Sequence, residues 1–454
     1  MEIWKLSSKE PITREANCKG EEMKGFSFWL TKILMLVTGF AILCFSGCSG
    51  TQTPDYPSDN DSKPIIPSET VEITTEEELF AIVDDLNGSY KLMNDITLTK
   101  SWKTIGNPTT PFTGVFDGNG HTIYTMNVES DVLYVDDTSI EYMVGMFGVV
   151  KGDVKNLTVD SLTVNITADT ISATNYTSML SQNNATTNLD IHVGLVGLNK
   201  GDIENVCVNV NFNVIPETAT ARIRIGGIAG KNNDSIENCK VSGNINVKNI
   251  DGYIRAGGVV GYVSSNGKVI SDQAHTDIIA EITSGAKMQL GGIVGNIECG
   301  IVNDCYATGT VIGTNTDTKA TLAGGLVGLI DNTDTKYEDM SVTVNGSYAN
   351  VNVTVTGSKG YAAGFIGQIE FDNTVTIANN GCLGTANGAK ASYGFVGRIQ
   401  TLLGTTLTIS DFTNGNYGGK VTFTENKSII DDNFATQVEM IEIPERFTTD
   451  IPSL

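Results

Sequence analysis

Apolar and polar residues alternate along residues 105–410 with the two-residue period of half-buried β-strands. The stretch 206–214 reads VCVNVNFNV, with an apolar side chain at every even position. The stretch 239–247 shows the same alternation, with Cys239, Val241, Ile245 and Val247 on one face, and no part of this region has a comparably long helical period. The pattern predicts strands with one buried face and one solvent-exposed face.

Each strand pattern follows an apolar phrase of the form Gly-x-x-Gly, such as RIGGIAGKN at 224–232 and RAGGVVGYV at 255–263. The phrases begin at Gly145, Gly194, Gly227, Gly258, Gly292, Gly325, Gly364 and Gly394, so they recur every 30 to 49 residues. A strand-turn-strand unit of this size cannot bury its apolar face alone, but stacked copies can enclose a continuous interior. We therefore expect an all-β fold, a parallel β-solenoid of about eight coils.

The repeated residues predict how the coils stack. The glycines should lie where the chain bends sharply or where its backbone approaches the next coil, because a Cβ is disfavoured at both places. The two residues between them should point into the core. Asparagines recur at the turn before the second strand, and we expect them to form one structural ladder along the solenoid. They are Asn156, Asn205, Asn238, Asn303 and Asn345.

These phrases resemble a known motif. The sequence GGIVG at 291–295, followed by VNDCYATGTV at 302–311, resembles the GLUG motif of bacterial surface proteins and of immunoglobulin A1 protease-type metallopeptidases. The segment PFTGVFDGNGHTIYTMNV at 111–128 is similar to the one that leads into such arrays. The resemblance implies a right-handed parallel β-solenoid and an extracytoplasmic location. It implies no reaction.

The segments that flank the repeats predict caps. In residues 69–104, Thr75 and Glu78 form a capping-box pattern ahead of an apolar helical face, so a short helix should cover the end of the stack. Residues 411–454 are less repetitive, and we expect a C-terminal cap or tail with strands near 420–425 and 438–443.

The N-terminal region predicts a lipid anchor. Residues 1–47 contain a 15-residue apolar run, 33–47, that suits a signal peptide, and Met23 is a plausible true start after a polar stretch, 1–22. The sequence FSGC at 45–48 resembles a bacterial lipobox, so Cys48 should carry lipid. Residues 48–68 form an acidic, Pro/Ser-rich tether. We expect a lipid-anchored protein of the cell envelope, at the outer-membrane, cell-surface or periplasmic face.

Charge and motif content exclude several functions. The net charge of −23 argues against nucleic acid as a partner, because phosphate binding needs a cationic surface. His121, His192 and His275 form no HExxH pair, and there is no GxSxG elbow or Walker loop. We therefore predict no catalytic residue, metal ligand or cofactor. The best acidic cluster, interpreted as a solvated loop, is Asp331, Asp334, Glu338 and Asp339.

The cysteines predict buried thiols and no disulfide framework. Cys239, Cys305 and Cys382 are expected in one inward column on alternate coils, about 9.6 Å apart and beyond disulfide reach. Cys207 aligns with Lys240 on the outer face, and Cys299 is the fifth cysteine of the solenoid.

One insertion, 165–190, accounts for the longest repeat spacing. Inserted loops of solenoids project from one face and often make the contacts, so Tyr176, Asn175 and Asn183 are the candidate binding residues. The favoured interpretation is a non-catalytic surface module for adhesion, with host or bacterial glycans or matrix proteins as partners. A β-helix polysaccharide lyase or hydrolase is the first alternative, and a structural stalk is the second.

Overall fold

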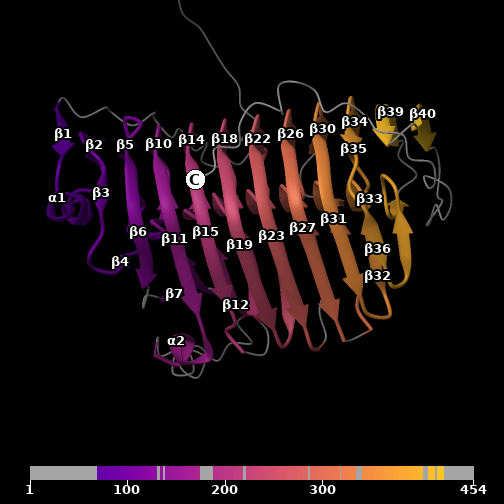
Figure 1. The fold of residues 1–454 in the computed structure, drawn as a ribbon, viewed down its shortest axis with the longest axis horizontal. Helices are drawn as coiled ribbons and strands as arrows, with labels where there is room; N and C mark the ends of the chain where they lie inside the picture. Colours follow the sequence, from indigo (N-terminus) through magenta and orange to yellow (C-terminus); the bar gives the residue numbers. More distant parts are fainter. Residues whose placement is uncertain are drawn as a thin grey trace, which may run out of the picture. The chain divides into compact units, whose positions relative to one another are not determined.

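The computed structural model describes residues 69–129, 133–135, 139–173, 188–217, 221–284, 287–316, 318–333, 340–401, 407–414 and 417–423. The signal region, Cys48, the tether and most of 411–454 lie outside these residues. The described chain is nearly all β-strand, arranged in three stacked sheets of parallel strands (Figure 1). Among these residues, no helix has the length and apolar character needed to cross a bilayer.

One coil illustrates the path of the chain. β16 (Ala221–Gly226) leads through a glycine corner into β17 (Ala229–Asn232), then into β18 (Ser235–Glu237) and the long β19 (Lys240–Asn249). Each of these strands pairs in parallel with the equivalent strand of the next coil, for example Val241 of β19 with Ala274. The chain is therefore a parallel β-solenoid, as the period predicted.

The first strand of each coil belongs to sheet C and the second to sheet B. Sheet C consists of β7 (Leu133–Val135), β8 (Ser139–Val144), β12 (Asn188–Val193), β16, β20 (Gly252–Gly257), β24 (Met288–Gly291), β28 (Thr321–Gly324), β32 (Gly360–Ala363) and β37 (Ala391–Tyr393). Sheet B consists of β9 (Phe147–Val150), β13 (Val196–Asn199), β17, β21 (Val260–Val263), β25 (Val294–Ile297), β29 (Val327–Asn332), β33 (Ile366–Phe371) and β38 (Ile399–Thr401). Sheet B has eight strands, one per coil, in agreement with the predicted number of coils.

Sheet A holds the third and fourth strands of each coil, and its long strands lie side by side in Figure 1. The long strands are β6 (Thr122–Glu129), β11 (Thr158–Ile166), β15 (Cys207–Val214), β19, β23 (Gln273–Ile282), β27 (Tyr306–Asn315) and β31 (Tyr348–Thr356). The others are β1 (Thr70–Ile73), β2 (Ser89–Leu92), β3 (Ile96–Thr97), β4 (Trp102–Lys103), β5 (Val115–Asp117), β10 (Asp153–Lys155), β14 (Asp202–Glu204), β18, β22 (Gly267–Ile270), β26 (Gly300–Asn303), β30 (Ser341–Asn345), β34 (Thr374–Ala378), β35 (Gly381–Cys382), β36 (Ala386–Gly388), β39 (Leu407–Asn414) and β40 (Tyr417–Phe423).

Short helices accompany the first coils. α1 (Glu76–Phe80) and the 3-10 helix η1 (Ala81–Asp84) lie at the N-terminal end, and α2 (Ala168–Ala173) lies in the insertion. The capping box predicted at Thr75 is present: its hydroxyl accepts from the Glu78 backbone N–H, and the Glu78 carboxylate accepts from the Thr75 N–H. Leu79 is fully buried, so this helix joins the core.

The glycine corners between sheets C and B have a steric cause. Gly258 N–H donates to the Gly292 carbonyl at 3.1 Å, and Gly292 N–H donates to the Gly325 carbonyl at 3.1 Å. A Cβ on Gly258 or Gly292 would lie closer than 3.0 Å to that same carbonyl oxygen of the next coil. None of these three glycines has a positive φ. Close backbone approach, and not left-handed backbone, therefore excludes side chains here.

The corners also point inward, toward sheet A. A Cβ on Gly292 would meet the Cβ of Ala307 at 2.7 Å, and one on Gly364 would meet Sγ of Cys382 at 3.0 Å. The residues opposite the corners are correspondingly small, with Ala274, Ala307 and Ala349 in register on adjacent coils. The corner is therefore re-entrant: sheets B and C bend toward sheet A instead of bulging away from it.

The asparagine turn differs from the predicted single ladder. Asn156, Asn205 and Asn238 occupy one turn with left-handed φ values of 52°, 56° and 56°. Asn205 Nδ2 donates to Asn156 Oδ1 at 3.3 Å. Asn303 and Asn345 lie one residue earlier, within β26 and β30, and form their own bond of 2.8 Å from Asn345 Nδ2 to Asn303 Oδ1. The prediction of one column was wrong because the turn residue changes type between coils.

The cysteine prediction was right for two of three thiols. Cys239 and Cys305 lie in one inward column on alternate coils, with Asp272 between them. Cys382 pairs with Ala349, two residues further along the strand, so its predicted place in that column was wrong. The five cysteines of the described residues are free, and burial raises the pKa of the Cys239 and Cys305 thiols.

Asp272 occupies a position where an amide suits the surroundings better. Its Oδ1 accepts from the Cys239 backbone N–H at 2.6 Å. Asn380 does the same for the Ser347 N–H at 2.9 Å, and its Nδ2 also donates to the Val344 carbonyl at 2.9 Å. Asp272 Oδ2 is buried and finds no hydrogen-bond partner in the described part of the chain. Burial, reinforced by the nearby Glu237 charge, raises the pKa of Asp272 well above its usual value.

Replacing a corner glycine tests the steric argument. Gly292→Ala should lower the free energy of unfolding by about 2–3 kcal/mol, because the backbone of the next coil must move. Gly313→Ala is the matched control, since its Cβ would meet only the ends of the Leu290 and Thr321 side chains. We expect a loss of about 1 kcal/mol or less for the control, measured by urea denaturation. Equal losses in the two variants would contradict the argument.

Replacing Asp272 tests the buried carboxyl. Because the folded-state pKa is raised, the carboxyl group stabilises the fold fully below its unfolded-state pKa, and this stabilisation is lost as the pH rises through the folded-state value. Asp272→Asn should therefore raise the free energy of unfolding at pH 7 by about 1–3 kcal/mol. The advantage of the variant should shrink as the pH falls from 7 to 5. A pH-independent difference between variant and wild type would refute the assignment.

Candidate functional site

The re-entrant corner creates a second packed layer on the outside of the solenoid. Side chains that point away from the core on sheets C and B face each other across the corner and bury one another. Met143 on sheet C and Val149 and Leu198 on sheet B form an apolar cluster separate from the main core. Further along, Asn296 Nδ2 on sheet B donates to Gln289 Oε1 on sheet C at 3.2 Å, and both residues are buried. We call this layer the outer seam.

The outer seam concentrates the arginines of an otherwise acidic chain. Arg222, Arg224, Arg255 and Arg398 are the four arginines within the described residues, and all occupy outward positions of sheets C and B. The whole chain has 52 acidic residues and 29 basic ones, so this clustering runs against its overall composition. The arginines of the described residues therefore gather on one face of the solenoid, whereas lysines such as Lys240 and Lys248 lie on sheet A.

Asp190 anchors two of these arginines. Arg222 lies beside it in register on the next strand, and its Nε and NH2 donate to the two carboxylate oxygens, NH2 to Oδ2 at 2.6 Å. Arg224 NH1 lies 3.4 Å from Oδ2. The Asp190 side chain is 7% exposed and that of Arg224 is 13% exposed, so the cluster is shielded from solvent.

His192 contacts the same cluster as a neutral ring. Its Nε2 lies 3.3 Å from Arg224 NH1, and because a guanidinium only donates, Nε2 accepts and Nδ1 carries the proton. Burial lowers the pKa of His192 well below its usual value, and the charges of Arg224, Lys231 and Arg222 lower it further. The Nδ1 atom is buried without a hydrogen-bond partner among the described residues.

Tyr262 forms the centre of the cationic part of the seam. The Arg255 guanidinium lies 4.2 Å from its ring centroid, Arg224 lies 5.4 Å away and the Lys231 ammonium 5.6 Å away. The Tyr262 hydroxyl donates to Glu298. Burial raises the pKa of Tyr262, and the Glu298 carboxylate raises it further, so the phenol stays protonated.

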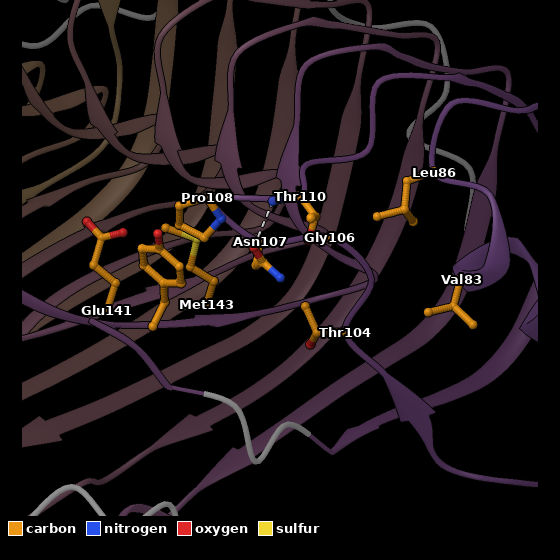
Figure 2. Close-up of a pocket in the computed structure, with 10 residues that line it drawn as sticks. Val83, Leu86, Thr104, Gly106, Asn107, Pro108, Thr110, Glu141 and Met143 are labelled. Atoms are coloured by element: carbon orange, nitrogen blue, oxygen red, sulfur yellow. Dashed lines mark hydrogen bonds between the residues drawn. The ribbon is translucent and has the colours of Figure 1, made fainter. Parts of the chain in front are cut away.

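A pocket of about 260 Å³ opens at the N-terminal end of the seam. Figure 2 shows Glu141 and Met143 of β8 on one side, close to Asn107 and Pro108, and Val83 on the other side. The lining is completed by Leu86, Thr104, Gly106, Thr110 and Tyr134. The pocket therefore combines an aromatic ring, a carboxylate, an amide and two hydroxyls with apolar walls.

The turn at 107–110 fixes the polar side of the pocket. Asn107 Oδ1 accepts from the backbone N–H groups of Thr109 and Thr110, each at 2.9 Å, and the second bond is drawn in Figure 2. The Thr109 hydroxyl donates to the Tyr134 hydroxyl at 2.7 Å. Asn107 and Tyr134 are thus held in place before any ligand arrives.

Glu141, Asp190 and His192 offer ligand atoms that all lie within 4.8 Å of one another, a spacing that could hold a metal ion. However, both oxygens of Asp190 already accept hydrogen bonds from Arg222, and Arg224 adds a second positive charge. A cation placed there would be repelled by these two guanidinium groups. These three residues therefore make a poor metal site.

The sequence-predicted binding and lipidation residues, Tyr176, Asn175, Asn183 and Cys48, lie outside the described residues. Of the acidic cluster, Asp334, Glu338 and Asp339 also lie outside them. Asp331 belongs to β29, where it pairs in register with Glu370, so its predicted loop position was wrong. His121 lies beside Asp95, with 3.2 Å between Nδ1 and Oδ1, and His275 contacts Thr308 on sheet A.

Sequence reasoning missed the outer seam. The signal was a basic residue two positions before a glycine at the end of the sheet C strand. It is seen in RIG at 224–226, RAG at 255–257 and HVG at 192–194. Alignment on the corner places His192, Arg224, Arg255 and Gln289 in one outward column, and Asp190 with Arg222 in another. Charged residues at outward positions look solvated until the re-entrant corner is known.

One comparison with known protein families agrees with the repeat architecture. Residues 221–246 match the family model of the GLUG motif, and this segment spans most of one coil, β16 to β19. A crystal structure described as "a putative immunoglobulin A1 protease" from Bacteroides ovatus aligns with 81% of this chain and 82% of its own, at 16% identity and a TM-score of 0.33. No curated protein matches the chain significantly.

Removing the Asp190 charge tests the seam. Asp190→Asn should lower the free energy of unfolding by about 3 kcal/mol, because it leaves two poorly solvated guanidiniums without their carboxylate. Glu281→Gln is the control. The Glu281 carboxylate lies 3.0 Å from the Lys248 ammonium, and the Lys248 side chain is 43% exposed. That exposed pair should contribute about 1 kcal/mol or less. Thermal and urea unfolding of both variants would measure the difference, and similar losses would contradict the buried cluster.

Proposed function

Since the chain is a GLUG-repeat β-solenoid, we propose that it is a non-catalytic, extracytoplasmic glycan-binding module whose ligand lies along the outer seam. The observation that carries the proposal is the pocket at the N-terminal end of the seam, with its pre-positioned polar groups and aromatic ring. Sites for small ligands are typically concave, with apolar walls and a few fixed polar groups.

The pocket chemistry suits a sugar ring. The face of Tyr134 can pack against the apolar C–H face of a pyranose, while the amide of Asn107 and the carboxylate of Glu141 can bond its hydroxyls. Because Asn107 and Tyr134 are already fixed by hydrogen bonds, less conformational entropy is lost on binding.

The seam continues this site along the solenoid. Glu141 lines the pocket, and its carboxylate also lies within 4.8 Å of the ligand atoms of Asp190 and His192. A chain of sugars that starts in the pocket can therefore extend over successive coils. Repeated outward side chains, one per coil, suit a polymer with a repeating unit.

The titratable groups of the seam support binding without catalysis. The Asp190 carboxylate forms an ion pair with Arg222, His192 is buried and uncharged, and the Tyr262 phenol donates to Glu298. A general base needs an available lone pair close to the substrate and a pKa near the working pH. These groups are held in other interactions, so the polysaccharide lyase or hydrolase alternative is less well supported.

The cellular location is part of the same proposal. The apolar run before FSGC at 45–48 supports a lipid on Cys48, and the tether 48–68 would separate the solenoid from the membrane. Anchored in this way, the module would present the outer seam to glycans outside the cytoplasm. Protein partners, including matrix proteins, are the competing class of ligand.

Glycan binding is tested with residues 62–454, the compact part of the chain that contains every described strand. Arrayed bacterial and host glycans and matrix proteins would be screened, and the same incubations checked for cleavage products. Tyr134→Ala should weaken glycan binding about tenfold, because it removes the aromatic contact. Tyr124→Ala, which removes an exposed tyrosine from sheet A, should leave binding unchanged.

Three outcomes would separate the functions. Saturable binding without cleavage, lost in Tyr134→Ala alone, supports a glycan-binding module. Cleaved glycan would replace the proposal with the lyase or hydrolase alternative. Binding to no glycan and no protein would leave a structural stalk.

A further inference from the structure

Arg255 presents an unused guanidinium edge on the outer seam. Its Nε donates to Gln289 Oε1 at 2.9 Å, and its plane lies near the Tyr262 ring, 4.2 Å from the centroid. Gln289 is itself fixed by Asn296, whose Nδ2 donates to the same oxygen at 3.2 Å. Gln289 therefore fixes the Nε edge of the guanidinium, and the Tyr262 ring packs against its plane. The two terminal nitrogens form a fork with the geometry that binds a carboxylate.

Positive charge exceeds negative charge around this fork. Within the described residues, no carboxylate oxygen lies within 4.0 Å of the Arg255 guanidinium or the Lys231 ammonium, in contrast to Arg222 and Arg224, which share Asp190. Arg255 and Lys231 both lie within 6 Å of the Tyr262 ring centroid. Four cations of the seam, Arg222, Arg224, Arg255 and Lys231, face three carboxylates, Asp190, Glu141 and Glu298, so a net positive charge remains that attracts an anion.

Two buried hydrogen-bond donors of the same seam also favour a negatively charged ligand. Arg224 Nε and His192 Nδ1 both carry hydrogens, are buried, and find no acceptor in the described part of the chain. His192 is only 2% exposed. A buried donor without an acceptor is costly, so acceptors are in deficit around Arg224 and His192, whereas Asn296 Oδ1 on the same seam is a buried acceptor without a donor among the described residues.

An exposed aromatic ring lies next to the fork. Tyr253 is 41% exposed, and the Arg255 guanidinium lies 5.7 Å from its ring centroid. Tyr253 follows Glu141, Asp190 and Arg222 in one register column over four adjacent strands of sheet C. At about 4.8 Å per strand, Tyr253 lies roughly 14 Å from the pocket residue Glu141.

We propose that the outer seam binds an acidic glycan, with Arg255 taking a sugar carboxylate and Tyr253 packing against a sugar ring. The inference rests on the proposed glycan-binding function and adds the charge of the ligand. The pocket at Glu141 receives a neutral sugar of the same chain, because a carboxylate there would repel an acidic one. A stretch of a few sugar residues spans the distance between the two sites.

The test compares charged and neutral forms of the same glycans. Hyaluronan oligosaccharides and sialyllactose, which contain both acidic and neutral sugars, would be titrated against residues 62–454, each beside its carboxyl-esterified form. We expect each acidic ligand that binds to lose at least tenfold in affinity on esterification. Arg255→Gln should cause a similar loss, while Lys248→Gln, the same charge change on sheet A, should cause none.

A further variant distinguishes geometry from charge. Arg255→Lys keeps the charge but loses the fork, so it should restore only part of the affinity. Equal binding of acidic and esterified glycans would overturn the inference and leave the proposed function standing. Binding of neither form would overturn both, and preference for acidic peptides over all glycans would reassign the seam to a protein partner. Unchanged melting temperatures in the Arg255 variants would exclude loss of folding.

Discussion

The structure depends on a backbone contact that leaves no room for a side chain. At the corners between sheets C and B at Gly258 and Gly292, the glycine N–H bonds directly to the carbonyl of the glycine in the next coil. On the inner side, the same corners lie against Ala274 and Ala307 of sheet A. At these two corners a glycine faces an alanine, which leaves room for the wall to fold inward.

The inward fold buries side chains at positions that point away from the core. On a convex solenoid, side chains on the outer face would be solvated, but here those of sheets C and B bury one another. Apolar residues such as Met143 and Leu198 pack there as a second small core. Charged residues such as Asp190 and Arg222 must pair, because few water molecules can reach them. The surface that results is rigid and chemically specific, two properties that recognition requires.

Much of the fold could be predicted from the sequence, because strand period, corner spacing and capping box are local properties. The alternation at 206–214 and the Thr75–Glu78 pattern have direct structural counterparts. Register between coils is not local, and errors of one residue at Asn303 and two at Cys382 arose there.

The candidate site was harder to predict for a related reason. Asp190 and Arg222 are 32 residues apart in sequence, and only the coil register places them side by side. Their contact with sheet B further depends on the direction in which the corner bends, which the residue pattern alone does not give. The spatial cluster of Tyr262 with Arg255 is of the same kind.

Because the backbone groups of corner glycines such as Gly258 and Gly292 bond only to adjacent coils, the coils are interchangeable units. Recombination between the DNA segments that encode two phrases would add or remove a whole coil and join equivalent glycines. The remaining coils would keep their hydrogen-bond partners, while the rod would lengthen or shorten by about 4.8 Å. The outward columns would gain or lose one side chain each. Ligand reach could thus evolve in discrete steps, without the redesign of a core.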